Sequence, residues 1–281
     1  MPIYDQGYRK YEAREALRRV RFWPITREAL RLILAKRAFL GLLALSWLPF
    51  VGFVIYVFIV TQFAQAGQIL PIDARLFARF LGFQVWPTLI VTVFGGAGLI
   101  ANDLRTGGIL VYLSRPLTRR DYVLGKLGVL LALNLSITLL PALLLYLVGL
   151  ALAPAYLLKW SLAGIAPALV VYAGVVSLVV SLLAVAVSAA SKSARVAGLG
   201  FFLLAVILDP IAMLVGSILR SPAASLLSIR ANLETLGDAL LGVAGGKLSL
   251  PWAYPALVLL ALGLVCLAVL RSRVRTVEIV T

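Results

Sequence analysis

The residues of this chain that could do chemistry are few, and most of them lie in one polar stretch, residues 101–126. That stretch holds five Lys or Arg and two Asp side chains, and it separates two long apolar runs. The whole chain has no His and one Cys, Cys266, which lies inside an apolar run. A His-based metal site, a Ser/His triad and a Cys/His pair all need side chains that are missing. The sequence therefore predicts no catalytic, metal or cofactor site, and it favours a surface that docks a partner.

The polar stretch carries the signals of a short structured loop. Thr106-Gly107-Gly108 is typical of a turn, residues 108–114 fit a short amphipathic helix, and Pro116 ends that helix. Thr118 can then cap the helix that leads into the next membrane span. We expect residues 102–126 to form a coupling loop with a defined shape.

The loop also carries the side chains that a docked partner would contact. Leu110 and Leu113 stand three apart and share one helix face, so they can supply an apolar contact to the partner. Arg105, Arg115 and Arg120 around them would pair with acids on that partner, or would instead anchor lipid head groups.

Two glycine patterns resemble nucleotide-binding motifs, but the sequence around them lacks the context that those motifs need. Residues 96–101 match G-x-G-x-x-A, with Asp121 about 20 residues further on. They follow a membrane-length apolar run with no alternation of strands and helices, so we expect these glycines to pack helices. Gly246-Lys247 lacks both the leading Gly and the Ser or Thr of a phosphate loop. We expect no ATP hydrolysis by this chain itself.

The elements that position the polar stretch are membrane helices. Of the 281 residues 62% are hydrophobic and the mean hydropathy is +1.04, whereas a soluble domain is about 45–50% apolar. A bilayer core needs about 20 apolar residues as helix. Six runs are long enough or nearly so: 38–61, 81–100, 127–153, 162–190, 196–219 and 255–270. The fold class predicted is all-α, a polytopic membrane protein with one transmembrane domain over residues 38–281.

The N-terminal segment, residues 1–37, is charged and lacks a signal-peptide pattern. Pro24 suits the first turn of an amphipathic helix over residues 25–37. Ile25, Ala29, Leu32 and Ile33 share its apolar face, which would lie on the membrane surface. The alternative is a solvated basic arm.

Charge sets the predicted orientation. Lys and Arg number 20 in residues 1–37, 102–126, 191–195 and after 270, against 6 in the alternate segments. The positive-inside rule places both termini and the polar loop in the cytoplasm. The net charge of +15 is explained by this distribution and by the anionic inner leaflet, not by nucleic acid.

Asp209-Pro210 lies inside the fifth apolar run, where a carboxylate is costly unless it meets water or a partner. One interpretation places Asp209 on a transport pathway. The other, which we favour, ends the fifth span near Leu208, with Asp209 capping a re-entrant helix that begins at Pro210. Residues 210–254 then form the external segment before the last span.

Small residues recur in the fourth and fifth runs, several of them four apart, which lets helix backbones approach closely. They would form either a subunit interface or ordinary contacts within one bundle, and we favour the second. The residues are Ser181, Ala184, Ser188, Ala190, Ala194 and Gly198.

A family resemblance rests on the second span and its loop. The order is Asn-Asp-Leu-Arg-Thr-Gly-Gly-Ile-Leu from Asn102, then Leu-Ser-Arg-Pro-Leu-Thr-Arg-Arg-Asp-Tyr from Leu113, then Gly125-Lys126. This resembles the permease subunit of type-2-class ATP-binding-cassette (ABC) exporters, which has an acid after the second span, a Gly-Thr/Ile-Leu turn, a Ser-x-Pro-x-Ser/Thr-Arg element and a Gly-Lys. The pair Gly107-Gly108 departs from the usual Gly-Thr.

The resemblance implies a multi-pass protein of a bacterial inner membrane that forms half of a transport pathway. Its partners would be a second permease copy, in a homodimer, and two ATPase subunits that bind ATP and Mg. An alternative is a scaffold that relays ATPase motion to an extracytoplasmic protein without moving a solute. The residues implied in ATPase coupling are Asp103, Arg105, Gly107, Gly108, Leu110, Leu113, Ser114, Arg115, Pro116, Arg120 and Lys126.

Overall fold

The protein is a bundle of long helices. The computed structural model describes residues 22–62, 72–108, 118–152, 164–243 and 250–274, and the regular secondary structure among these is helical. Six stretches are long and apolar enough to cross a membrane, so the predicted all-α polytopic class is confirmed. Their bounds are Arg37–Gln62, Ala74–Thr106, Arg119–Leu152, Ile165–Ala190, Ala194–Leu219 and Ala253–Arg273.

The six spans contain most of the individual helices, and short helices flank or interrupt them. The elements are α1 Trp23–Leu34, α2 Arg37–Leu45, α3 Leu48–Gln62, α5 Ala74–Gly96, α6 Ala101–Thr106, α8 Arg119–Leu152, α9 Ile165–Ala190, α10 Ala194–Phe202, the π-helix η3 Leu203–Ile207, α11 Leu208–Leu219, the 3₁₀-helix η4 Pro222–Leu227, α12 Ile229–Leu240 and α13 Ala253–Arg273.

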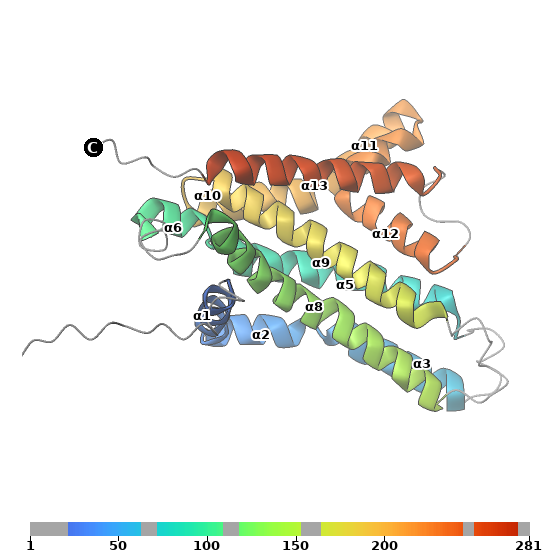
Figure 1. Cartoon of the computed structure of the whole chain (residues 1–281). Helices are drawn as coiled ribbons and strands as arrows, with labels where there is room; N and C mark the ends of the chain where they lie inside the picture. Colours follow the sequence, from blue (N-terminus) through green and yellow to red (C-terminus); the bar gives the residue numbers. More distant parts are fainter. Residues whose placement is uncertain (1–21, 63–71, 109–117, 153–163, 244–249, 275–281) are drawn as a thin grey trace, which may run out of the picture.

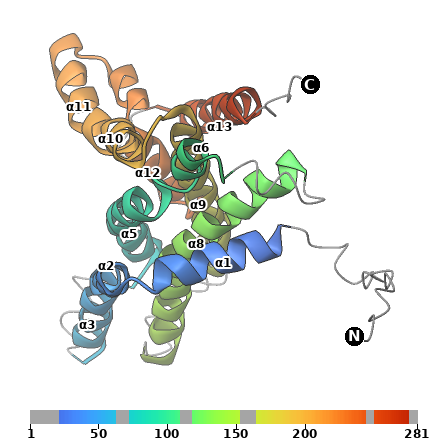
Figure 2. The ribbon, with the colours of Figure 1, turned by 90° about the vertical axis from the view of Figure 1, so that its left-hand side faces the viewer.

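The bundle has two distinct ends (Figure 1). One end carries α1, α6 and the first turns of α8, and we call it the α6 end. Figure 2 looks onto it and shows α1 lying across α8. At the opposite end, the α12 end, α5 begins and α12 packs against α5, α9 and α13. Helices α8 and α9 pack along each other through the centre.

The first span is broken in the middle, which its uninterrupted apolar run did not predict. Helix α2 ends at Leu45 and α3 begins at Leu48, immediately before Pro49. The break leaves the carbonyl of Ser46 outside both helices. Gln84, a fully buried residue of α5, donates from its side-chain amide to Ser46 O at 2.9 Å.

The same amide joins a second helix break. Its nitrogen also donates to Ile137 O at 2.8 Å. Pro141, inside α8, has no backbone N–H, so it cannot donate to the carbonyl of Ile137, which lies four residues earlier in the helix. Backbone groups in a membrane must find partners within the protein. Gln84 therefore ties the first, second and third spans together at two carbonyls that their own helices leave free.

Buried hydroxyl and amide groups continue this pattern between α5, α8 and α9. Asn134 of α8 accepts from Thr92 Oγ1 at 2.9 Å and donates to Ser181 Oγ at 3.0 Å. All three side chains are fully buried. Of the six small residues noted in the sequence, Ser181, Ala184 and Ser188 are buried within the chain itself, Ala194 and Gly198 are half-buried, and Ala190 is exposed.

Helix α1 packs more deeply than a surface helix would. Its bounds differ little from the predicted 25–37, and three of the four residues predicted on its apolar face pack inward, with Ile25 buried and Ala29 and Ile33 partly buried against the core. Ile25 is buried against α8, where a Cβ at Gly125 would lie 2.8 Å from the Cβ of Ile25. Thr26 Oγ1 donates to Gly125 O at 2.9 Å. Leu32, which was also predicted on the buried face, is 61% exposed. The reason is that Gly125 of α8 has no side chain, so the side of α1 that carries Ile25 and Thr26 packs closely against α8.

The fifth span does not end near Leu208, as we expected it to. Helix continues from α10 through the π-turn η3 into α11 and stops at Leu219, where Arg220 takes a left-handed conformation with φ 48°. A π-turn widens the helix by one residue and gives room for Pro210 without a chain break. After Arg220, η4 packs back along α11 and α12 returns to the bundle.

The bridging role of Gln84 predicts a measurable loss of stability. Gln84→Leu leaves two buried carbonyls without their donor, which should cost about 1–3 kcal/mol and lower the apparent melting temperature in detergent. Gln62→Leu, the same change at the exposed end of α3, is the matched control and should melt like the wild type. Pro141→Ala restores an N–H for Ile137 and should recover part of the loss. Wild-type melting of Gln84→Leu would contradict the assignment.

Candidate functional site

The predicted coupling residues Asp103 and Lys126 meet at the α6 end. Asp103 Oδ2 lies 2.8 Å from Lys126 Nζ and accepts a hydrogen bond from the Tyr122 hydroxyl, also at 2.8 Å. We call these three residues the α6–α8 clasp. Tyr122 was not among the residues predicted for the site. Its signal in the sequence is the spacing of four from Lys126, which puts both on one face of α8.

The ion pair of the clasp is buried, so it restrains the position of α6 more strongly than a contact on the surface would. The Lys126 side chain is 6% exposed and that of Asp103 is 20% exposed. A buried ammonium is tolerated where a carboxylate neutralises it, and removal of one partner is strongly destabilising. The Lys126 Nζ also lies 5.6 Å from the centre of the Tyr122 ring. The clasp thus fixes α6 to the first turns of the third span.

The start of α6 is held by a residue of α9. Residues 97–100 form turns between α5 and α6. Ser188 Oγ accepts from the N–H groups of Ile100 and Ala101 at 3.1 and 3.0 Å, and donates to Ala97 O at 2.9 Å. One buried hydroxyl therefore satisfies both sides of the break. From the sequence, Ser188 was predicted only as a small residue that lets helices pack closely.

Glycines at this break pack helices, as we expected from the failed dinucleotide pattern. A Cβ at Gly96 would lie 3.1 Å from Ala184 Cβ and 3.1 Å from a methyl of Leu130. A Cβ at Gly98 would lie 2.6 Å from the Asn102 amide nitrogen. The Gly96 contacts bring α5 close to α8 and α9 beside the clasp, whereas Gly98 leaves room for the Asn102 side chain at the start of α6.

The loop beyond the clasp is described at its two ends. Gly107 ends α6 in a left-handed conformation with φ 69°, which confirms the predicted turn. On the far side, the backbone N–H of Asp121 donates to Thr118 Oγ1 at 3.2 Å and the Thr118 N–H donates back to Asp121 Oδ2 at 3.0 Å. This reciprocal capping confirms Thr118 as the start of α8.

The remaining predicted coupling residues divide into two groups. Arg105 and Arg120 are exposed beside the clasp, and Gly108 follows the turn at Gly107. The others lie outside the described residues: Leu110, Leu113, Ser114, Arg115 and Pro116.

Asp209 belongs to a second charged cluster, at the junction of the fifth span with α12. It does not cap a helix, because α11 is continuous with η3 and no side chain caps it. Asp209 Oδ2 accepts from Arg230 Nε at 2.9 Å and pairs with Nη2 at 2.8 Å, and its Oδ1 accepts from the Ser228 hydroxyl. Ser228 is itself the N-cap of α12 and accepts from Ala231 N–H at 3.0 Å. The interpretation that Asp209 caps a helix is therefore wrong. Asp209 instead accepts a hydrogen bond from Ser228, the residue that caps α12.

Arg230 is the centre of this cluster. Its Nη1 donates to Glu234 Oε1, one turn further along α12, and its guanidinium carbon lies 5.4 Å from the centre of the Trp86 ring. Burial lowers the pKa of Arg230, but the bonds to Asp209 and Glu234 and their charges raise it, and the net direction is upward. Arg230 thus stays positively charged between two acids. Sequence reasoning found Asp209 but not Arg230, which lies 21 residues away.

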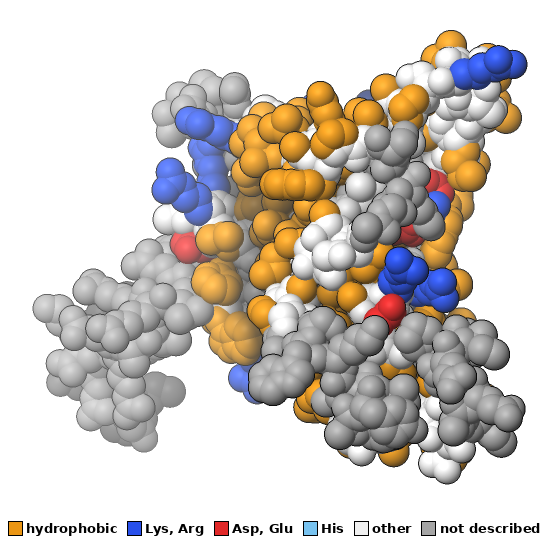
Figure 3. Space-filling view, turned by 90° about the vertical axis from the view of Figure 1, so that its right-hand side faces the viewer, with side chains coloured by type: hydrophobic (Ala, Val, Ile, Leu, Met, Phe, Trp, Pro, Cys, Tyr) orange, Lys and Arg blue, Asp and Glu red, His pale blue; other side chains and the backbone are white. Residues whose placement is uncertain are grey.

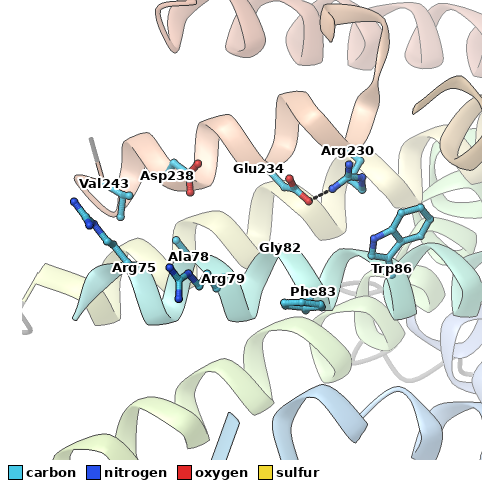
Figure 4. A pocket seen from close by; sticks show the side chains of 10 residues that line it. All are labelled: Arg75, Ala78, Arg79, Gly82, Phe83, Trp86, Arg230, Glu234, Asp238 and Val243. Atoms are coloured by element: carbon cyan, nitrogen blue, oxygen red, sulfur yellow. Dashed lines mark hydrogen bonds and ion pairs between the residues drawn. The ribbon is translucent and has the colours of Figure 1, made fainter. Parts of the chain in front are cut away.

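A cavity of about 560 Å³ opens beside this cluster, between α5 and α12 (Figure 4). Along α5, two arginines are followed by two aromatic residues. Along α12, the residues run in the opposite direction from Arg230 to Asp238. The lining residues are Arg75, Ala78, Arg79, Gly82, Phe83, Trp86, Arg230, Glu234, Asp238 and Val243.

Comparison with known protein families and with curated proteins gives no match for this chain.

The Asp209 cluster predicts unequal effects of two substitutions. Asp209→Ala removes one carboxylate from the buried Arg230 and the acceptor of Ser228, which should cost about 3–5 kcal/mol. Asp209→Asn should cost less, because its amide oxygen can still accept from Ser228. Thermal unfolding in detergent measures the loss of stability in both variants. The control is Arg220→Gln, which changes an exposed arginine between α11 and η4. Equal melting of Asp209→Ala and the wild type would contradict the cluster's role.

Proposed function

We propose that this chain is the transmembrane permease subunit of an ATP-driven ABC transporter, an exporter, and that a separate ATPase docks on the loop after the second span. The observation that carries the proposal is the α6–α8 clasp. A loop that only connects two spans needs no buried ion pair at its base. Here Asp103, Tyr122 and Lys126 fix the helix that leads into the loop, as transmission of movement from a docked partner requires.

The clasp suggests a route for that movement. A partner that shifts the loop would shift α6, and the Asp103–Lys126 pair would carry the shift to α8. Ser188 would carry it to α9, because its hydroxyl bonds both sides of the α5–α6 break. The contact of Ile25 with Gly125 would include α1 in the same unit. The second, third and fourth spans would then respond together.

In the proposed assembly, two copies of the chain form a homodimer with two ATPase subunits, which bind ATP and Mg and carry out hydrolysis. The distribution of Lys and Arg supports both termini and the α6 end in the cytoplasm of a bacterial inner membrane. Lysines and arginines near the surface would also contact anionic lipid.

A second function, a scaffold that relays force to an extracytoplasmic partner, is favoured by one observation. Helix α11 extends away from the other spans (Figure 1) and ends in apolar side chains that face outward, with Ile218 70% and Leu219 65% exposed. A partner seated there would receive movement through the Asp209 cluster. Copurification of an extracytoplasmic protein together with the ATPase would favour this function over transport of a solute.

The docking proposal predicts that one substitution in the loop removes the ATPase. Leu110→Asp places a carboxylate in the apolar contact, which should cost a few kcal/mol of binding free energy, roughly a hundredfold or more in affinity. Affinity purification from native membranes, followed by an assay of coupled ATP hydrolysis, should show loss of the ATPase with normal membrane insertion.

Leu219→Asp is the matched control, since it makes the same change at an exposed leucine of the opposite end, and it should retain the ATPase. Wild-type retention of an ATPase by Leu110→Asp, with normal coupled turnover, would contradict the docking assignment.

A further inference from the structure

One wall of the cavity between α5 and α12 changes from cationic to aromatic side chains along its length, and the proposed ATPase coupling does not use it. Arg75, Arg79 and Phe83 follow one another at intervals of four along α5 and so share a helix face, and Trp86 lies nearly one turn further. From Arg75 to Trp86 the helix rises about 16 Å. The wall therefore passes from two cations at the end of a membrane span to aromatic side chains deeper in it (Figure 4).

The two arginines differ from the third arginine of the cavity. Arg230 is held between Asp209 and Glu234, whereas Arg75 and Arg79 are exposed and form no ion pair within the described part of the chain. Figure 3 looks onto this end of the protein and shows basic side chains gathered next to acidic ones. Guanidinium groups are suited to phosphate because they donate in a planar fork.

The opposite wall limits where an anion can lie. Glu234 reaches across to α5, where a Cβ at Gly82 would be 3.6 Å from its Oε1, and it is bonded to Arg230. Asp238 lies further along the same helix. Glu234 neutralises Arg230 at the deep end of the cavity, whereas Arg75 and Arg79 at the other end remain as cations for an anion, with Asp238 on the facing helix near them. Phe83, which is 59% exposed, remains available to a hydrocarbon chain.

We propose that this cavity binds a membrane amphiphile with a phosphate-ester headgroup, the phosphate at Arg75 and Arg79 and the hydrocarbon chain along Phe83. The volume of about 560 Å³ is within the range of small-molecule sites, about 300–1,000 Å³. The site does not depend on the ATPase, so the isolated chain can test it.

The test uses the full-length chain purified in dodecyl maltoside, a detergent without phosphate, and native mass spectrometry of bound lipid. The probe is dioleoyl phosphatidate, and dioleoylglycerol, with the same chains and no phosphate, is its control. One phosphatidate should be retained and dioleoylglycerol should not. Arg75→Gln with Arg79→Gln should reduce the retained fraction roughly tenfold, since charge-assisted pairs with phosphate are lost.

Matched variants distinguish this site from nonspecific retention of lipid. Arg220→Gln removes an exposed arginine from the hairpin of α11 and η4 and should leave binding unchanged. Phe83→Ser should weaken phosphatidate retention several-fold if the hydrocarbon chain lies there. The arginine variants change exposed side chains and should melt like the wild type. If the double variant melts early, phosphatidate retention is measured for each single variant instead.

Equal retention of phosphatidate by the double arginine variant and the wild type would overturn the proposal. Displacement of phosphatidate by millimolar inorganic phosphate would also overturn it, because the ligand would then be soluble phosphate and not an amphiphile. Retention of dioleoylglycerol equal to that of phosphatidate would show that the chains alone bind, with the same consequence.

Discussion

The structure depends on one constraint: wherever a membrane helix is interrupted, the protein must supply partners for the backbone groups that the interruption frees. Three of the interruptions are satisfied in the same way, by a polar side chain from a neighbouring helix. Gln84 bonds the carbonyls freed at Ser46 and by Pro141, and Ser188 bonds both sides of the α5–α6 break. At the start of α12, Ser228 caps the helix and is bonded to Asp209 of the fifth span. Each solution also links helices that are distant in sequence, so the breaks become the joints of the bundle.

The pair Gly125-Lys126 shows how two adjacent residues organise the α6 end. Gly125 has no side chain, and Ile25 of α1 occupies the space that a Cβ would need. Lys126, on the next position of α8, points to Asp103 of α6. One turn of the third span therefore receives α1 on one side and α6 on another. This arrangement explains in physical terms why a glycine and a lysine stand together there.

Much of the fold was predictable because hydropathy and charge act locally. Six apolar runs predicted six spans, Thr106-Gly107-Gly108 predicted a turn, and Thr118 predicted the start of α8. The span from Ala74 began earlier than predicted, since Arg75 and Arg79 interrupt the apolar run but not the helix. The break at Ser46 and the true partners of Asp209 were missed, because both depend on residues far away in the sequence, Gln84 and Arg230. Of the coupling residues, Asp103 and Lys126 were found to meet, whereas the contact surface itself, with Leu110 and Leu113, stays a prediction.

A buried ion pair between Asp103 and Lys126 fixes the loop-bearing helix α6 to the third span. A double-mutant cycle with Asp103→Asn and Lys126→Gln, followed by unfolding in detergent, tests it most directly. If the pair acts as a unit, each single variant leaves the other charge less well neutralised, and the double variant loses less than the two single losses combined, with a coupling energy of about 1–3 kcal/mol. Additive losses, within about 0.5 kcal/mol, would contradict the claim.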